Sequence, residues 1–338
     1  MESPNKKEIQ NADTIDGSLK KATKKYNRTL AYVVASTILL LGIAAAAFII
    51  FYQPISDSIV LKNANPAMVA LAQQAGMSRQ GELVFLRTNP QLATDSQMRT
   101  FCAGNAAANN KNGFIEQGCF VPDSHNHANG RIYIRQMPAN LYDQEIVTAS
   151  YEMLHSVYFK LAGSSEQTVL VQTIESNYNS LHTPSLDAQV INFAKTEPGY
   201  RDLELFSLLG TEFANVSSGL QKFYAPYFTN RLLSVDSYDH VTSIFQDEQT
   251  QLQQLRNTIA TDDGLANKAY ADSLGWARQG NAYEDTYNYN IYTNYISQEN
   301  NAIDQYNNLS SAYNTLVTEY NGTQPVNSIN NVQTQGAK

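Results

Sequence analysis

The sequence predicts a helix-rich α+β protein with a single N-terminal transmembrane helix and a C-terminal antiparallel helical hairpin. Three observations predict this class. Residues 30–52 carry no charge and are long enough to cross a bilayer as a helix. Short apolar stretches bounded by Gly, Asn and Pro between residues 81 and 138 indicate a small sheet. From about residue 234, apolar side chains recur at three- and four-residue spacing, which is typical of paired long helices.

Charge gives the orientation of the predicted anchor. Residues 1–28 hold seven Lys/Arg and four Asp/Glu, a net charge of +3 in a chain of net charge −8, so the remainder carries −11. The positive-inside rule places residues 1–29 in the cytoplasm and the chain after residue 53 outside a bacterial cell membrane, with the bilayer as a partner. The small residues 44–47 leave cleavage of a signal peptide as an alternative. The acidic body argues against nucleic acid as a partner.

The two cysteines, Cys102 and Cys119, both lie on the predicted outer side. An even pair in an oxidising compartment predicts one disulfide. Closing so short a loop would contribute about 3 kcal/mol to stability in the chain-entropy model.

The elements between the anchor and the hairpin follow from periodicity and from turn residues. After a connector over residues 53–65, we expect a helix over 65–76, a strand over 81–88 (GELVFLRT), a helix over 94–103, a loop over 103–113, a strand over 115–121, a turn over 122–130, a strand over 131–137, and helices over 141–161, 165–182, 184–196 and 201–213. Pro226 breaks the segment that follows.

The hairpin is predicted over residues 234–322. One seam would hold Val241, Phe245, Leu252, Leu255 and Ile259, and the other Tyr292, Ile296, Ile303, Tyr306, Tyr313, Val317 and Tyr320. The turn is expected at Thr261-Asp262-Asp263-Gly264. Buried tyrosines bring hydroxyl groups that need hydrogen-bond partners. Residues 323–338 form a polar tail that we expect to be disordered.

One motif on the 141–161 helix suggests chemistry. In TASYEMLHSVY (148–158), Glu152 and His155 have the spacing of the last two functional residues of a zinc-protease H-E-x-x-H helix. Tyr151 stands where the first His ligand would be, and a neutral phenol is a poor substitute. The motif alone is also compatible with an ordinary helix. Glu204 and Glu212 on a later helix have separations usable for a third ligand.

Four stretches carry a family resemblance, namely ELVFLRTNPQL (82–92), GCF with GRIYI (118–134), VTASYEMLHSVY (147–158), and LELFSLLGTEF (203–213) with KFYAPYFTNR (222–231). On these the chain resembles uncharacterised bacterial membrane-anchored proteins with a zincin-like, metallopeptidase-like outer domain and a C-terminal coiled coil. The resemblance covers roughly residues 25–320. It implies a zincin-like domain over 53–233, with Glu152 as base, His155 as second ligand and Glu212 as third ligand. Tyr151 departs from the family pattern.

The other histidines and motifs add little. His125 and His127 form an H-x-H pair in a polar loop, a substitute ligand or more simply a solvated turn, while His182 and His240 have the character of surface or cap residues. Phosphate-loop, dinucleotide, nucleophile-elbow and C-x-x-C fingerprints do not occur in the sequence.

The predicted function is therefore a membrane-anchored envelope protein with an inactive metallopeptidase-like domain. Its role would be binding or scaffolding, with a protein or peptide partner in the cleft or along the coiled coil. No cofactor is expected for it. Two alternatives stay open. One is an active zinc metallopeptidase with His155, Glu212 and either Tyr151 or a loop His as ligands. The other is a structural or adhesive surface protein.

Overall fold

A computed structural model describes residues 37, 41–42, 56–103, 115–125, 127–196, 199–322, 329–330 and 332–333. The chain divides into two compact units, Met1–Asn63 and Ala64–Lys338. In the first unit, residues 56–63 are helical. The predicted cytoplasmic tail, and the predicted anchor apart from Thr37, Leu41 and Gly42, lie outside the described residues. Among the residues that are described, the helices are all too short or too polar to span a membrane.

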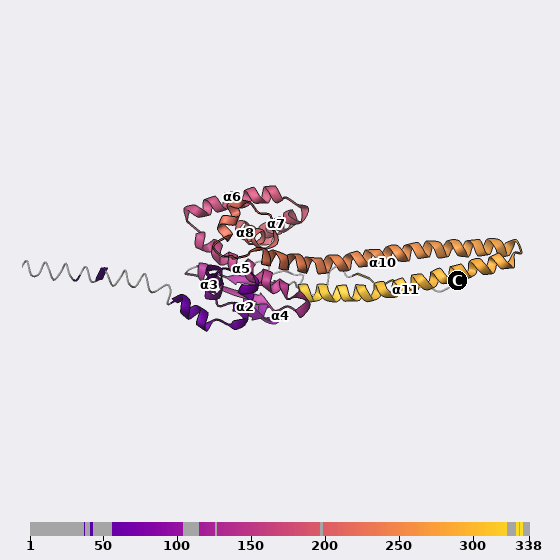
Figure 1. Ribbon diagram of the computed structural model, residues 1–338, viewed down its shortest axis with the longest axis horizontal. Helices are drawn as coiled ribbons and strands as arrows, with labels where there is room; N and C mark the ends of the chain where they lie inside the picture. Colours follow the sequence, from indigo (N-terminus) through magenta and orange to yellow (C-terminus); the bar gives the residue numbers. More distant parts are fainter. Residues whose placement is uncertain are drawn as a thin grey trace, which may run out of the picture. The chain divides into compact units, whose positions relative to one another are not determined.

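The second unit is helix-rich with one small sheet, as the sequence predicts (Figure 1). Its elements, in chain order, are α2 (Pro66–Gln74), α3 (Arg79–Arg87), β1 (Gln91–Ala93), α4 (Asp95–Phe101), β2 (Gly118–Val121), the 3-10 turn η2 (His127–Asn129), β3 (Arg131–Arg135), the 3-10 turn η3 (Ala139–Leu141), α5 (Asp143–Leu161), α6 (Ser165–Leu181), α7 (Pro184–Thr196), α8 (Arg201–Glu212), α9 (Ser218–Tyr224), α10 (Leu232–Arg278) and α11 (Ala282–Asn321).

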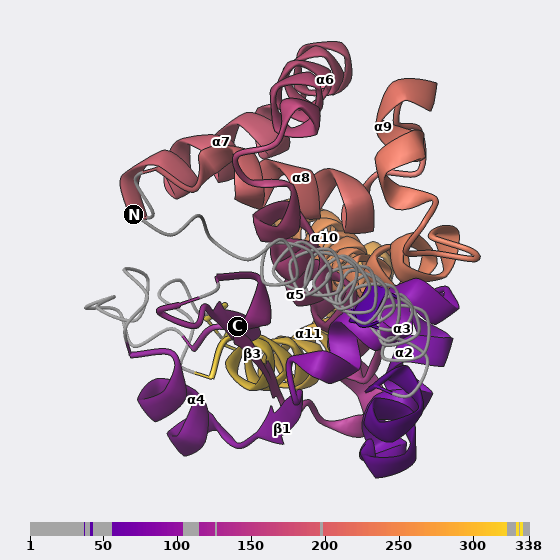
Figure 2. The same cartoon turned by 90° about the vertical axis from the view of Figure 1, so that its left-hand side faces the viewer.

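Helix α5 is the centre of this unit. It lies between α6, α7 and α8 on one side and α2, α3 and the sheet on the other (Figures 1 and 2). Its buried positions occupy every face, including Ile146, Ala149, Met153 and Val157, which the sequence places on one inward stripe. A helix buried all round must also bury its polar side chains, so these need partners inside the protein.

The sheet has the order β1-β3-β2. Strand β1 pairs parallel to β3, with Leu92 opposite Ile134, and β2 pairs antiparallel to β3, with Cys119 opposite Tyr133. Strand β3, which comes directly before α5, is therefore the central strand of the described sheet, and both β2 and β3 contact α5.

The stretch GELVFLRT was predicted as a strand and is instead helix α3. Ser78 caps the helix, with its side chain accepting a hydrogen bond from the Gly81 amide at 3.1 Å. The consecutive apolar residues Leu83–Leu86 are all buried. No exposed polar position interrupts them, so the sequence shows no helical period there. Short apolar runs of this kind do not distinguish a buried helix from a buried strand.

Cys102 and Cys119 form the predicted disulfide. It ties the end of α4 to β2 and lies in a small apolar cluster with Ala93, Met98, Ile115 and Tyr133. The ring of Phe101 stacks on Tyr133 with centroids 4.4 Å apart.

Helices α10 and α11 form the predicted hairpin and run side by side over most of their lengths (Figure 1). The predicted turn at Thr261–Gly264 is wrong, because α10 continues through it to Arg278. The chain reverses instead at residues 279–281, where Gly280 has a φ of +73°. A left-handed backbone is accessible to glycine at little cost, whereas a single Gly inside a helix costs only about 1 kcal/mol and does not end it.

The seam of the hairpin is largely as predicted. Val241, Leu252, Ile296 and Ile303 are buried, and so is Tyr306. The Tyr306 hydroxyl accepts hydrogen bonds from the Arg256 guanidinium at 2.7 and 2.9 Å, so this buried tyrosine has the partner that it needs.

The end of α11 is held by the sheet. Arg135 of β3 is 4% exposed, forms a 2.6 Å ion pair with Asp95 and donates hydrogen bonds to the carbonyls of Glu319 and Tyr320. A guanidinium is favourable at a helix C-terminus because it satisfies unpaired carbonyls and opposes the negative end of the helix dipole. Gly322 ends the helix in the left-handed conformation.

Candidate functional site

The candidate site lies in the middle of α5, where Tyr151 and His155 face α8 and Glu152 lies under β2. Tyr151 and His155 are one turn apart, and their rings make an edge contact with centroids 5.1 Å apart. Glu152 and His155 are 4% and 7% exposed. The motif that the sequence singled out is therefore a buried polar cluster and not an exposed helix face.

Glu204 of α8 completes this cluster. The Tyr151 hydroxyl donates a 2.5 Å hydrogen bond to its Oε2. The other carboxylate oxygen, Oε1, lies 3.4 Å from Nε2 of His155, while Nδ1 of His155 lies 3.2 Å from Glu152 Oε2. The imidazole is therefore held between two carboxylates, one at each ring nitrogen.

Strand β2 covers the cluster. The Phe120 amide donates a hydrogen bond to the Glu152 carboxylate, and the Phe120 ring meets the His155 ring edge-on at 6.4 Å. Gly118 of the same strand approaches so closely that an added β carbon would overlap the Thr148 methyl group and the Glu152 side chain. Only a residue without a side chain lets the backbone lie this close to α5.

The electrostatics favour a protonated imidazole. Burial alone would lower the pKa of His155, but the carboxylates of Glu204 and Glu152 outweigh it and raise that pKa well above its usual value. Burial raises the pKa of Glu152, and the His155 charge opposes that rise. Burial and the charge of Glu204 raise the pKa of Tyr151 well above 10, so its hydroxyl stays a neutral donor.

This arrangement does not fit a zinc ion. Catalytic zinc requires three protein ligands converging on one point, with an open fourth position. Here His155 Nε2 and Glu204 Oε1 face each other at 3.4 Å. Tyr151 donates its hydroxyl proton to Glu204, and Glu152 lies beside the other ring nitrogen, so neither supplies a third ligand atom at that point. In the part of the chain that the structure describes, three potential ligand atoms gather only at Cys102, Glu116 and Cys119, and the two sulfurs there are bonded to each other.

Glu212, the third ligand implied by the family resemblance, has other partners. Tyr238 and Gln189 donate hydrogen bonds to its carboxylate, and burial raises its pKa to about 7. It lies eight residues beyond Glu204 on α8, about 12 Å along the helix axis. The structure therefore brings Glu204, and not Glu212, against His155. The sequence signal for Glu204 is a single acidic residue inside the apolar run LELFSLL.

The remaining histidines lie apart from the cluster. His127 of η2 packs edge-on against Phe159 with centroids 5.7 Å apart and is exposed, like His125. His182 and His240 are exposed and pair with Asp187 at 3.0 Å and Asp143 at 2.6 Å, which is the surface role that the sequence predicts. Of the H-x-H pair, neither residue contributes to the cluster.

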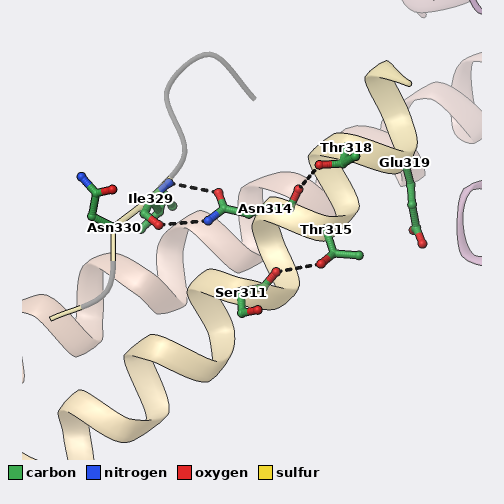
Figure 3. Close-up of a pocket in the computed structure, with 7 residues that line it drawn as sticks. All are labelled: Ser311, Asn314, Thr315, Thr318, Glu319, Ile329 and Asn330. Atoms are coloured by element: carbon green, nitrogen blue, oxygen red, sulfur yellow. Dashed lines mark hydrogen bonds between the residues drawn. The ribbon is translucent and has the colours of Figure 1, made fainter. Parts of the chain in front are cut away.

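Two open hollows occur elsewhere, along α11. They have volumes of about 510 and 530 Å3 and share the lining residues Ser311, Thr315 and Glu319. The first is drawn in Figure 3. The Tyr151–His155–Glu204 cluster lines neither of them. No protein-family model, curated protein or solved structure was found to match the chain.

Proposed function

We propose that the chain is a membrane-anchored, extracytoplasmic envelope protein whose metallopeptidase-like domain is not catalytic and serves in binding or scaffolding. The observation that carries the proposal is the 2.5 Å hydrogen bond from Tyr151 to Glu204. In a zinc-protease helix the residue at position 151 would be a ligand. Here it is a neutral donor to the carboxylate of Glu204, whose other oxygen lies 3.4 Å from Nε2 of His155.

The environment of Glu152 supports the same conclusion. A general base must reach a water or substrate proton. The Glu152 carboxylate instead lies beside Nδ1 of His155, accepts the Phe120 amide and is covered by β2 at Gly118. Hydrogen bonds and ion pairs therefore join the side chains that a metal would join in an active enzyme.

The hairpin supports a role in binding. Residues 232–321 contain twelve Asp/Glu and three Lys/Arg, a net charge of −9. The hairpin therefore carries most of the net charge of −11 that follows residue 28. Near its turn, Tyr283 and Tyr287 are 77% and 55% exposed. Exposed tyrosines supply large contact areas at low entropic cost, and they are enriched in protein interfaces.

Zinc content tests the proposal. The full chain, purified in detergent with zinc supplied, should hold no stoichiometric zinc by elemental analysis. A Tyr151→His variant supplies the missing imidazole beside His155 and Glu204, so a gain of about one zinc per chain would identify the cluster as a former metal site.

The opposite result would favour an active metallopeptidase. Stoichiometric zinc in the wild-type chain that disappears in His155→Ala would contradict the proposal. So would chelator-sensitive cleavage of a peptide library that is lost in Glu152→Gln. Cleavage that persists in Glu152→Gln would indicate a contaminating protease.

A further inference from the structure

A hollow with an acidic lining lies where the hairpin meets the 3-10 turn η3. It is the second of the two hollows along α11, and its volume of about 530 Å3 is in the range of small-molecule sites. Three elements contribute to its walls, namely η3 with Asn140, α10 with Glu248, and α11 with six residues from Asn308 to Glu319. The hollow is therefore built where the hairpin packs on the rest of the second unit.

The lining of this hollow is negatively charged and rich in hydrogen-bond acceptors. Glu248 and Glu319 bring two carboxylates, and the lining residues that the structure describes include no Lys, Arg or His. Amide and hydroxyl groups complete the polar part of the lining, at Asn140, Asn308, Ser311 and Thr315. The Thr315 hydroxyl donates its proton to the Ser311 carbonyl at 3.0 Å, so its oxygen is left as an acceptor. This set of groups favours a ligand that is positively charged and donates hydrogen bonds.

Glu248 carries the most specific signal. Its Oε2 atom is buried and has no hydrogen-bond partner within the described part of the chain. Buried polar atoms in folded proteins nearly always have a partner, because an unpaired one has lost its hydration without compensation. Burial also raises the pKa of Glu248, which is the direction expected where no cation faces a carboxylate. A ligand that donates a hydrogen bond to Oε2 would therefore compensate for this lost hydration.

The two carboxylates are offset along the hairpin, with an apolar surface between them. The Gln249 side chain donates a 2.5 Å hydrogen bond to the Tyr313 hydroxyl across the seam, so Glu248 is about level with residue 314 of α11. Glu319 lies five residues further along α11, a rise of about 7.5 Å. Leu316 lines the hollow between these levels and is 6% exposed. An unbranched alkyl chain would cover this surface and join the two polar ends.

A protonated primary amine matches these features better than a guanidinium or a metal ion does. An ammonium group donates up to three hydrogen bonds in different directions, and the acceptors here come from three elements. A guanidinium requires acceptors arranged in one plane. A calcium ion requires six to eight oxygen atoms converging within about 2.6 Å, whereas the volume of the hollow is many times that of a bound water molecule.

We propose that this hollow is a binding site for a protonated primary amine on an unbranched alkyl chain, with the ammonium group at Glu248 Oε2 and the chain over Leu316. Such a ligand has two sources. A free diamine would bring its second ammonium group to Glu319, and a partner polypeptide would insert a lysine side chain, whose stem buries readily on apolar surface. The hairpin's net charge of −9 would concentrate either cation near the site. The site shares no residue with the Tyr151–His155–Glu204 cluster and does not depend on the function proposed for that cluster.

Calorimetric titration of the full chain in detergent tests the proposal, with cadaverine as the diamine and N-acetyl-lysinamide as the lysine analogue. At a salt concentration of about 0.15 M, which screens attraction between distant exposed charges, at least one of these amines should bind saturably, one molecule per chain. Glu248→Gln should weaken this binding about tenfold or more, because the ammonium group loses a charged partner at a buried oxygen. Ala312→Trp, which fills the hollow from α11 without changing its charge, should abolish binding.

A matched pair of double variants separates this site from general attraction to an acidic surface. Glu248→Gln with Glu319→Gln removes the two carboxylates of the hollow. Asp247→Asn with Asp304→Asn removes the same charge from exposed positions of the same two helices, outside the hollow. The first double variant should lose at least tenfold more affinity than the second for the amine that binds. Melting curves of all variants check that each one is folded.

The relative affinities of the two amines identify the source of the ligand. Tighter binding of cadaverine would support a free diamine, and tighter binding of N-acetyl-lysinamide would support a lysine side chain. Three results would overturn the proposal, namely no saturable binding of either amine, equal losses of affinity in the two double variants, or binding that survives Ala312→Trp. Calcium binding that is lost in Glu248→Gln, while neither amine binds, would also overturn it and would identify a metal site instead.

Discussion

At the scale of single residues, Tyr151 decides the chemistry of α5. Its hydroxyl donates a hydrogen bond to the carboxylate of Glu204, a residue that is 5% exposed. The sequence could identify Tyr151, Glu152 and His155 as one group, because their spacing alone places them on neighbouring faces of a helix. It could not choose between Glu204 and Glu212, since that choice depends on how α8 is positioned against α5.

The Tyr151 hydroxyl should contribute more to the free energy of unfolding than an exposed tyrosine hydroxyl does. Tyr151→Phe removes the hydroxyl that donates to Oε2 of the buried Glu204, so the free energy of unfolding should fall by about 1–3 kcal/mol. Tyr142→Phe is the control, because Tyr142 donates a 2.8 Å hydrogen bond to Gln74 from an exposed position. Urea denaturation of both variants measures the difference. Equal losses would mean that burial of the Glu204 contact contributes nothing.

The pH dependence of stability should contain a contribution from Glu212. Burial raises its pKa in the folded chain from 4.5 to about 7, so the folded state binds the extra proton more tightly than the unfolded state. The resulting stability is fully present below about pH 4.5 and is lost as the pH rises through about 7. Glu212→Gln should abolish this loss and stabilise the chain at pH 8.5 by about 2–3 kcal/mol.

Denaturation at pH 5, 7 and 8.5 measures this effect. Asp247→Asn, which removes one exposed carboxylate from α10, is the control for the loss of a negative charge. A profile for Glu212→Gln that is parallel to the wild type would show that Glu212 does not titrate in this range.

At the scale of elements, local signals succeeded where their period was visible. The helices α5 to α8 and the two long helices of the hairpin were predicted from apolar spacing, because each runs for 12 residues or more, which is longer than an ordinary strand. The errors fell on α3, whose apolar run is buried throughout, and on Thr261–Gly264, whose turn-forming residues lie inside α10. In both, packing outweighed local propensity.

Two helical glycines offer a direct comparison of propensity with packing. At Gly264 an added β carbon would meet nothing within 4 Å, so Gly264→Ala should stabilise the chain by about 0.5–1 kcal/mol. At Gly210 of α8 the same atom would lie 2.5 Å from Leu154 and 3.0 Å from the Tyr224 ring, so Gly210→Ala should destabilise it by about 1–3 kcal/mol.

Guanidinium denaturation of the two alanine variants gives the comparison. A destabilising Gly264→Ala would mean that residue 264 does not adopt the ordinary helical backbone conformation.

At the scale of the whole molecule, charge, cysteine content and the predicted anchor are the features that support the proposed extracytoplasmic location. The N-terminal 28 residues are basic, whereas the hairpin alone carries a net charge of −9. The disulfide between Cys102 and Cys119 would be lost in a reducing cytoplasm. The anchor was predicted entirely from composition, since its length and lack of charge are visible without knowing any tertiary contact.

The disulfide therefore reports on which side of the membrane the second unit lies. In bacterial cells expressing the full chain, residues 30–52 should deliver Cys102 and Cys119 to the oxidising side, so a thiol-reactive polymer should label neither cysteine without prior reduction. A chain that lacks residues 1–53 stays in the cytoplasm, where glutathione and thioredoxin keep thiols reduced, and both cysteines should be labelled after denaturation. Fusing a cleavable signal peptide to this shorter chain should restore protection, which separates the effect of compartment from that of chain length. Labelling of the full chain without reduction would contradict the predicted orientation, because the geometry that joins the two sulfurs belongs to the second unit and is the same in every version tested.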